Sequence, residues 1–345
     1  MGSSLYTPLY KESILIDMLA PLMDSELRFL RKKVEEALAR YKRVRLVNRP
    51  SWFELREIRR SSSIASDSSF LGVLTRYAFV YVIRAFSAPF TGSSEDVIRY
   101  GRYLARFDAM ELLSSLDDED SSPYPYRDRR GVVHHIAKDL EVASVKAVSD
   151  SIRSPPDLVL FDGSLRSFFY NRFRGGDPFS ESLRRSWVER VETLKKLSEV
   201  SRVVFVSKVH TRQVLSRFLR PEIDGEPVIV PDYALVDKIF EDRPRVPGFL
   251  EPIEISENET GIRYTLTYAI LAKGAPAYQV TMPGSISTEE VSEILEMVRF
   301  HSASGYPEPL RQCHYHSKIG RREFLQLLGA YGVRLESGRE VLGEL

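Results

Sequence analysis

The feature that most constrains this chain of 345 residues is a short, continuous apolar run, Leu-Val-Leu-Phe, at residues 158–161. A proline pair at 155–156 precedes the run, and Asp162-Gly163-Ser164 follows it. Apolar runs of this length between turn residues are typical of strands buried inside α/β sheets. We therefore predict a buried strand that ends at Asp162, where its last side chain meets the edge of the sheet.

The remaining pattern places this strand in a mixed sheet. Residues 63–88 are rich in β-branched and aromatic residues and predict a strand pair interrupted at Gly72. Further strands are predicted over 202–207, 228–230, 262–271 and 277–282. Helices are predicted over 99–116, 132–151, 183–200, 211–219, 233–241, 288–300 and 316–330. Strand pairs followed by alternating strands and helices predict an α/β fold with one mixed sheet flanked by helices.

The N-terminal segment predicts a helical extension. Apolar residues at 27, 30, 34, 38 and 41 share one helical face, and basic residues dominate residues 28–45. This basic segment fits either a solvated helix face or a surface that meets a phosphate backbone or an acidic partner. We predict an N-terminal helical extension over residues 1–60 and one large domain over residues 61–345.

Composition excludes several classes of protein. The 49 basic and 48 acidic residues leave a net charge of +1, which excludes a uniformly basic surface. The single cysteine excludes an intrachain disulfide framework and a cysteine zinc cluster. No stretch approaches the roughly 20 apolar residues of a membrane span, and no signal-peptide pattern begins the chain. We expect a soluble cytoplasmic protein with no membrane partner, and no P-loop for hydrolysing ATP.

Three acidic residues stand where carboxylates are unusual in a purely structural role. Asp67 lies among small and apolar residues, Asp162 ends the buried strand, and Glu141 lies on the helix before it. Carboxylates brought together at a sheet edge repel one another unless a cation lies between them. Oxygen ligands of this kind suit Mg²⁺ or Mn²⁺, which can clamp the attacking and leaving oxygens of a phosphodiester. Taken singly, each aspartate also fits a turn or a cap.

A second concentration of candidate residues lies at 304–319. Tyr306 occupies a proline-punctuated turn, and His314 and His316 follow at the expected start of a helix. An imidazole can ligate a metal or position water, and a tyrosine hydroxyl can donate to phosphate oxygens. The pair His134 and His135 has no assignment from the sequence.

The order of these segments resembles the archaeal NurA nuclease family over roughly residues 60–320. The resemblance rests on ASDSS (65–69), the helix glutamate, LVLFDGSL (158–165), VVFVSKVH (203–210), VPDYALVDKIF (230–240) and GYPEPLRQCHYH (305–316). It implies an RNase H-like fold and a Mn²⁺-dependent nuclease acting on single- and double-stranded DNA, with 5′–3′ exonuclease and single-strand endonuclease activities. It also implies a ring-like homodimer that works with the HerA hexameric translocase in DNA end resection.

The resemblance also implies a set of site residues. Asp67, Glu141 and Asp162 correspond to the acidic metal-binding residues, for two Mn²⁺ or Mg²⁺ ions. Tyr306 and His314 complete the catalytic set, with His314 ligating a metal or orienting water. The family's first motif is usually Asp-Gly-Ser, whereas this chain has Asp67-Ser68-Ser69, and Glu111 competes with Glu141.

Lys208 resembles a family lysine that could contact phosphate; otherwise it is a surface lysine. Two other functions stay open: a non-catalytic DNA-binding clamp on the same fold, and an RNase H-like RNA-processing nuclease.

Overall fold

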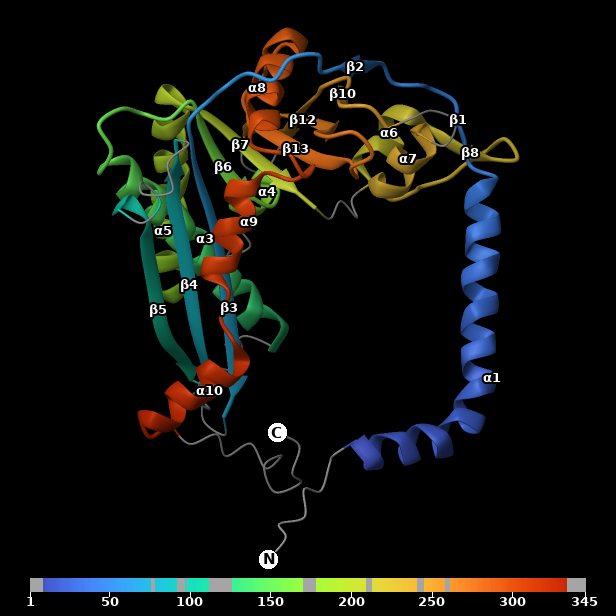
Figure 1. The fold of residues 1–345 in the computed structure, drawn as a ribbon, viewed down its shortest axis with the longest axis horizontal. Helices are drawn as coiled ribbons and strands as arrows, with labels where there is room; N and C mark the ends of the chain where they lie inside the picture. The colour runs from blue at the N-terminus through green and yellow to red at the C-terminus, as the bar shows by residue number, and fades with distance from the viewer. Residues whose placement is uncertain are drawn as a thin grey trace, which may run out of the picture. The chain divides into compact units, whose positions relative to one another are not determined.

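The computed structural model describes residues 9–75, 78–91, 97, 99–111, 126–169, 178–208, 213–240, 245–257 and 261–333 (Figure 1). By its contacts the chain divides into two compact units, Met1–Arg49 with Thr211–Leu235, and Pro50–His210 with Val236–Leu345. The predicted division into residues 1–60 and 61–345 stays a prediction. Among the helices of the described residues, none combines the length and the apolar character needed to cross a membrane.

The smaller unit contains the predicted N-terminal helix, α1 (Leu9–Lys42). A short antiparallel sheet joins β1 (Arg45–Leu46), β8 (Pro221–Ile223) and β9 (Glu226–Pro227), and α6 (Val214–Leu219) precedes β8. The Asp232 carboxylate accepts hydrogen bonds from the first amides of α6, which have no partner within the helix. The predicted strand at 228–230 is wrong, because the chain has left β9 by residue 228.

The larger unit is built on a ten-stranded sheet in the order β2-β10-β12-β13-β7-β6-β3-β4-β5, with β11 paired to β12. Its first strands are β2 (Trp52–Glu54), β3 (Ser63–Leu74), β4 (Ala78–Phe90), β5 (Arg102–Glu111), β6 (Leu158–Asp162) and β7 (Arg202–Ser207). The others are β10 (Gly248–Leu250), β11 (Ile253–Glu257), β12 (Ile262–Ile270) and β13 (Tyr278–Pro283). Its helices are α3 (Tyr126–Ser149), α4 (Leu165–Phe169), α5 (Pro178–Val200), α8 (Thr288–Phe300), α9 (Glu308–Ser317) and α10 (Arg321–Ala330), while α7 (Asp232–Ile239) spans the boundary between the units.

The centre of this sheet confirms the predicted RNase H-like arrangement. Strand β3 pairs antiparallel with β4 and parallel with β6, and β6 pairs parallel with β7. Helices α3 and α9 cover opposite faces of β3 (Figure 1). Successive residues of a strand point to opposite faces, so alternate residues of β3 contact α3 and α9. Ser66 contacts Ser144 of α3, whereas Asp67 contacts His314 of α9.

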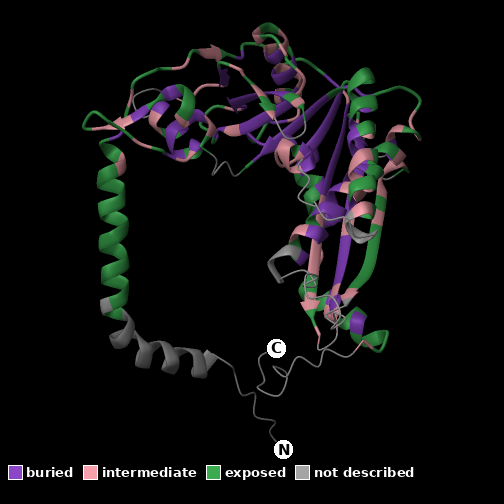
Figure 2. Ribbon diagram, turned by 180° about the vertical axis from the view of Figure 1, so that it is seen from behind, coloured by how far each residue is buried: buried purple, intermediate pink, exposed green. Residues whose placement is uncertain are grey.

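The core explains why the apolar run at 158–161 forms the central strand. Every residue from Leu158 to Phe161 is fully buried. The Phe161 ring stacks on Phe205 of β7 and contacts Phe168 of α4. The buried centre of the sheet stands out in purple in Figure 2, and β3, β6 and β7 each carry a run of buried residues there. The core thereby fixes the end of β6, from which Asp162 extends.

Three predictions of local structure are wrong. Residues 102–111 form the edge strand β5, not a helix, because pairing with β4 outweighs the helix propensity of their Ala, Leu, Met and Arg residues. Gly72 does not interrupt the strand pair but lies inside β3, opposite Tyr81. The predicted helix at 316–330 is two helices, so His314 and His316 lie in the last turn of α9. Residues 112–116, 211–212 and 241 of predicted helices lie outside the described residues.

Candidate metal centre

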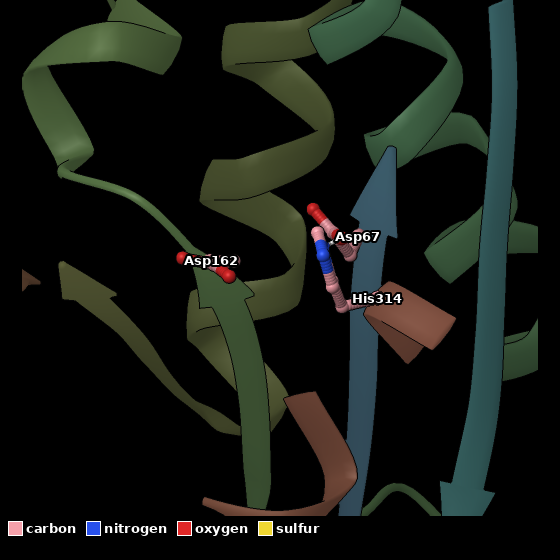
Figure 3. Close-up of side chains that lie close together, drawn as sticks. All are labelled: Asp67, Asp162 and His314. Carbon is pink, nitrogen blue, oxygen red and sulfur yellow. Dashed lines mark hydrogen bonds and ion pairs between the residues drawn. The ribbon is translucent and has the colours of Figure 1, made fainter. Parts of the chain in front are cut away.

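Two carboxylates and one imidazole converge on the α9 side of the sheet. One ligand atom each from Asp67, Asp162 and His314 lies within 4.8 Å of the others. The two aspartates meet because Ser66 of β3 is in register with Phe161 of β6, so the next residue of each strand is an aspartate. Figure 3 shows Asp67 and His314 side by side from β3 and α9, with Asp162 at the tip of β6.

Asp67 is held from α9 by two hydrogen bonds. His314 Nδ1 lies 2.7 Å from Asp67 Oδ2, and Ser317 Oγ donates to the same oxygen over 3.1 Å. An ionised carboxylate only accepts, so His314 Nδ1 carries the proton in this contact. In the neutral tautomer with its proton on Nδ1, the ring has a free lone pair on Nε2, which suits ligation of a metal. The Asp67 side chain is buried, whereas that of His314 is half-exposed.

Asp162 is paired with Lys208 beside Tyr306. Lys208 Nζ donates to Asp162 Oδ2 over 2.8 Å and lies 4.3 Å from the centre of the Tyr306 ring. The Tyr306 hydroxyl is buried without a hydrogen-bond partner among the described residues. Burial raises the Tyr306 pKa far above its usual value, and the nearby Asp162 carboxylate raises it further. The phenol therefore stays protonated and can serve only as a hydrogen-bond donor or a neutral acceptor.

Glu141 is fully buried on the other face of β3. Its Oε2 accepts hydrogen bonds from Lys138 Nζ and Ser68 Oγ, both over 2.8 Å, and its Oε1 has no partner among the described residues. Burial raises the Glu141 pKa to about 7, although Lys138 opposes the shift. Lys138 Nζ also lies 3.4 Å from the backbone oxygen of Asp162 and 4.3 Å from the centre of the Phe168 ring. Lys138 thus joins Glu141 to the end of β6.

The predicted site residues differ in how closely the structure brings them together. Asp67, Asp162 and His314 form the cluster, and Tyr306 adjoins it through Lys208. Glu141 lies next to the cluster, with its carboxylate on the α3 side; its role as a ligand stays a prediction. Glu111 pairs with Ala78, eight positions along β4 from Phe86, the partner of Asp67. At about 3.3 Å per residue, Glu111 lies roughly 26 Å from Asp67 along the strand and is excluded from the cluster.

The structure adds two residues that sequence reasoning missed. Lys138 precedes Glu141 by three positions, which places both on one face of α3 and is a signal that could have been used. Ser317 follows His314 by three positions on α9, for the same reason. His135, left without an assignment by the sequence, lies in a buried network with Arg190 and is not part of the cluster.

The donor set fits a hard divalent cation. Carboxylate oxygens are the preferred ligands of Mg²⁺ and Mn²⁺, and Mn²⁺ also accepts an imidazole nitrogen. Asp67, Asp162 and His314 supply two carboxylates and one imidazole within the spacing of a shared ion. Glu141 is not part of this group of three, and its unpartnered, buried Oε1 lies on the α3 side of β3.

A family model for the NurA domain matches residues 61–319, which include all of the site residues described above. The chain belongs to the NurA family. The match confirms the resemblance found in the sequence. No curated protein sequence matches the chain.

Solved NurA structures share the fold. The NurA nuclease from Sulfolobus solfataricus is 17% identical, with a TM-score of 0.58 over 95% of this chain and 97% of that chain. A NurA structure with manganese is 15% identical, with a TM-score of 0.55 over 93% of this chain and 99% of that chain. A NurA structure bound to dAMP and manganese is 14% identical, with a TM-score of 0.53 over 93% and 97% of the two chains. At identities this low, the likeness shows a shared fold, and the evidence for the site comes from the residues of this chain.

Proposed function

We propose that this chain is a divalent-metal-dependent deoxyribonuclease that hydrolyses phosphodiester bonds, with Mn²⁺ as its preferred ion. The observation that carries the proposal is the convergence of Asp67, Asp162 and His314 within 4.8 Å, in a member of the NurA family. The manganese and dAMP named for other NurA structures support the choice of ion and of a deoxynucleotide substrate.

Each site residue has a role that its surroundings support. Asp67, Asp162 and His314 Nε2 would hold the cation, with Glu141 Oε1 as a further ligand beside a second position. A divalent cation bound there would polarise the scissile phosphate and lower the pKa of the attacking water. The buried, protonated Tyr306 hydroxyl would donate to a phosphate oxygen, and Lys208 would leave Asp162 to contact phosphate.

The wider role implied by the family is part of the same proposal. It comprises cleavage of single- and double-stranded DNA in end resection, with 5′–3′ exonuclease and single-strand endonuclease activities, in a homodimer that works with a HerA-type hexameric ATPase translocase. Helix α1 supports a protein interface, because Leu27, Leu30, Val34 and Leu38 form an apolar stripe at helical spacing and are each about half exposed or more.

The decisive test compares wild-type protein with Asp162→Ala on end-labelled DNA in Mn²⁺, in Mg²⁺ and in EDTA. We expect cleavage by the wild type that needs the ion, and a loss of at least about a hundredfold in the variant, since an oxygen ligand of the cation is removed. Surface variant Glu226→Ala, in β9 of the other unit, is the control and should cleave at the wild-type rate. Cleavage that is unchanged in Asp162→Ala would refute the metal site.

Substrate choice separates the remaining functions. A non-catalytic clamp on the same fold would bind DNA without cleaving it in either ion. An RNA-processing enzyme would cleave RNA faster than DNA of the same sequence. The presence of the whole acidic set, Asp67, Glu141 and Asp162, favours the catalytic reading over the clamp.

A further inference from the structure

A row of aromatic residues continues from the metal cluster across the sheet. Asp67 of β3 is paired with Phe86 of β4, and Phe86 is paired with Tyr103 of β5. Directly paired residues of neighbouring strands project from the same face, so all three side chains lie on the α9 side. The Phe86 and Tyr103 ring centres are 4.5 Å apart. At about 4.8 Å per strand, Tyr103 lies roughly 10 Å from Asp67.

Aromatic residues of helix α9 pack against this row. The His316 ring lies 4.7 Å from Phe86, and the Tyr103 hydroxyl is 2.8 Å from His316 Nδ1. Tyr315 follows at 5.7 Å from His316, edge to face. Phe86 is buried beneath the others, but Tyr103 is 54% exposed and Tyr315 is 77% exposed. We call Tyr103, Tyr315 and His316 the aromatic surface; its Tyr315 directly follows His314 of the cluster.

Basic side chains follow the aromatic surface along the chain. Lys318, Arg321 and Arg322 come directly after α9 and are exposed. None of the three forms an ion pair with another residue in the described part of the chain, so their charge is available to an anion. Exposed aromatic rings beside free cations are the combination with which proteins bind single-stranded nucleic acid, the rings stacking on bases and the cations contacting phosphates.

We propose that the aromatic surface stacks on the unpaired bases of single-stranded DNA and so aligns the strand whose phosphate reaches Asp67, Asp162 and His314. The inference rests on the proposed function and adds how the same site recognises its substrate. Stacking needs a base whose face is free, which a paired duplex does not offer. The hydrogen bond between Tyr103 and His316 fixes the Tyr103 ring in advance, which lowers the entropy lost on binding.

The test measures binding of a fluorescent oligothymidylate in metal-free buffer by anisotropy, beside an abasic strand of equal length. The abasic strand keeps every phosphate and lacks every base. We expect Tyr315→Ala and Tyr103→Leu each to weaken binding of the oligothymidylate by about tenfold, as expected for one lost stacking contact. Binding of the abasic strand and of duplex DNA should change by less than about twofold, because the phosphate contacts are retained.

Matched variants make the outcome specific. Tyr103→Phe keeps the ring and loses only the hydroxyl contact to His316, so it should bind more tightly than Tyr103→Leu. Tyr331→Ala removes an equally exposed tyrosine outside the row and should bind as the wild type does. Because Tyr315 is highly exposed, Tyr315→Ala should fold normally, and its binding tests the inference even if Tyr103→Leu fails to fold. Equal losses on the oligothymidylate and the abasic strand, or no loss in either variant, would overturn the inference. Base-dependent binding without Mn²⁺-dependent cleavage would instead contradict the proposed function and support the stacking surface.

Discussion

Lys138 and Glu141 form a buried ion pair whose cost of desolvation is offset only while both partners are present. Lys138→Met leaves a carboxylate fully buried without its counter-charge, and such a change typically costs about 3–5 kcal/mol. We expect Lys138→Met to lower the free energy of unfolding at pH 8 by up to this amount. Lys138 holds the Glu141 pKa down to about 7, so without Lys138 that pKa rises and protonation of Glu141 limits the loss. Urea denaturation followed by circular dichroism measures the loss.

The double variant Lys138→Met/Glu141→Gln provides the control. Removing the charge of Glu141 as well removes the reason for the penalty, so we expect at least half of the lost stability to return. A double variant no more stable than Lys138→Met would show that Lys138 acts through its packing on Phe168, and not through Glu141.

The sequence predicts those site residues that stand out against an apolar background. Asp67 and Asp162 are recognisable because each is a charged residue in a largely apolar strand segment, and the register of β3 with β6 makes them neighbours. The contact between His314 and Asp67 joins residues far apart in the chain, so only the resemblance connected them. The side of β3 on which Glu141 lies depends on the docking of α3, which no local pattern records.

At the scale of elements, the β3–β4 hairpin depends on a glycine that makes room for a ring. A Cβ atom at Gly72 would lie 2.2 Å from Cζ of the buried Phe79. Gly72→Ala therefore forces Phe79 out of its place, and overpacking of this kind typically costs about 1–3 kcal/mol. We expect a corresponding fall in the free energy of unfolding, measured by urea denaturation.

Gly131→Ala is the matched control for this prediction. Gly131 lies inside α3, and a Cβ there would have no neighbour within 4 Å. The change should stabilise the protein by about 0.5–1 kcal/mol, because alanine favours a helix. Combining Gly72→Ala with Phe79→Leu should recover part of the loss, whereas a neutral Gly72→Ala would contradict the packing argument.

Elements that bury a clear apolar pattern are predicted well, and exposed ones are not. Strands β6 and β7 and helix α8 lie where the pattern placed them, since their buried residues carry the periodicity. Edge strand β5 is mostly exposed, so its residue types suit contact with solvent and give no sign of its pairing with β4. Helices α9 and α10 are separated at residues 318–320. Gly320 caps the start of α10, and Arg84 Nε donates a hydrogen bond to the backbone oxygen of Ser317 at the end of α9, which is a tertiary contact.

At the scale of the whole molecule, near-neutral net charge conceals local concentrations of charge. Carboxylates gather at the cluster, with Lys138 and Lys208 beside them, and exposed cations follow α9. A net charge of +1 is therefore compatible with a protein that binds DNA along one path. The same reasoning applies to stability, because a few buried groups decide how the fold responds to pH.

His135 is the clearest of these groups. Its Nε2 lies 3.1 Å from the Leu183 oxygen of α5, and its Nδ1 lies 3.3 Å from Nη2 of the buried Arg190. The carbonyl can only accept and the guanidinium can only donate, so the ring is held neutral with its proton on Nε2. Burial, together with the charge of Arg190, lowers the His135 pKa to about 3.

The depressed pKa makes the stability of the whole molecule fall in acid. Between pH 6.5 and 3 the unfolded chain binds a proton at His135 that the folded protein does not, so stability is present above pH 6.5 and is lost as the pH falls toward 3. One such site contributes about 1.4 kcal/mol per pH unit.

We expect His135→Gln, which can still donate to Leu183 and accept from Arg190, to remove this slope. Urea denaturation of both proteins at intervals from pH 7 to 4 gives the slope of unfolding free energy against pH for each. Burial raises the Asp139 pKa, so Asp139 contributes a slope of opposite sign. That contribution is present in both proteins and cancels in the difference between their slopes. Parallel curves for the two proteins would show that His135 titrates alike in the folded and unfolded states.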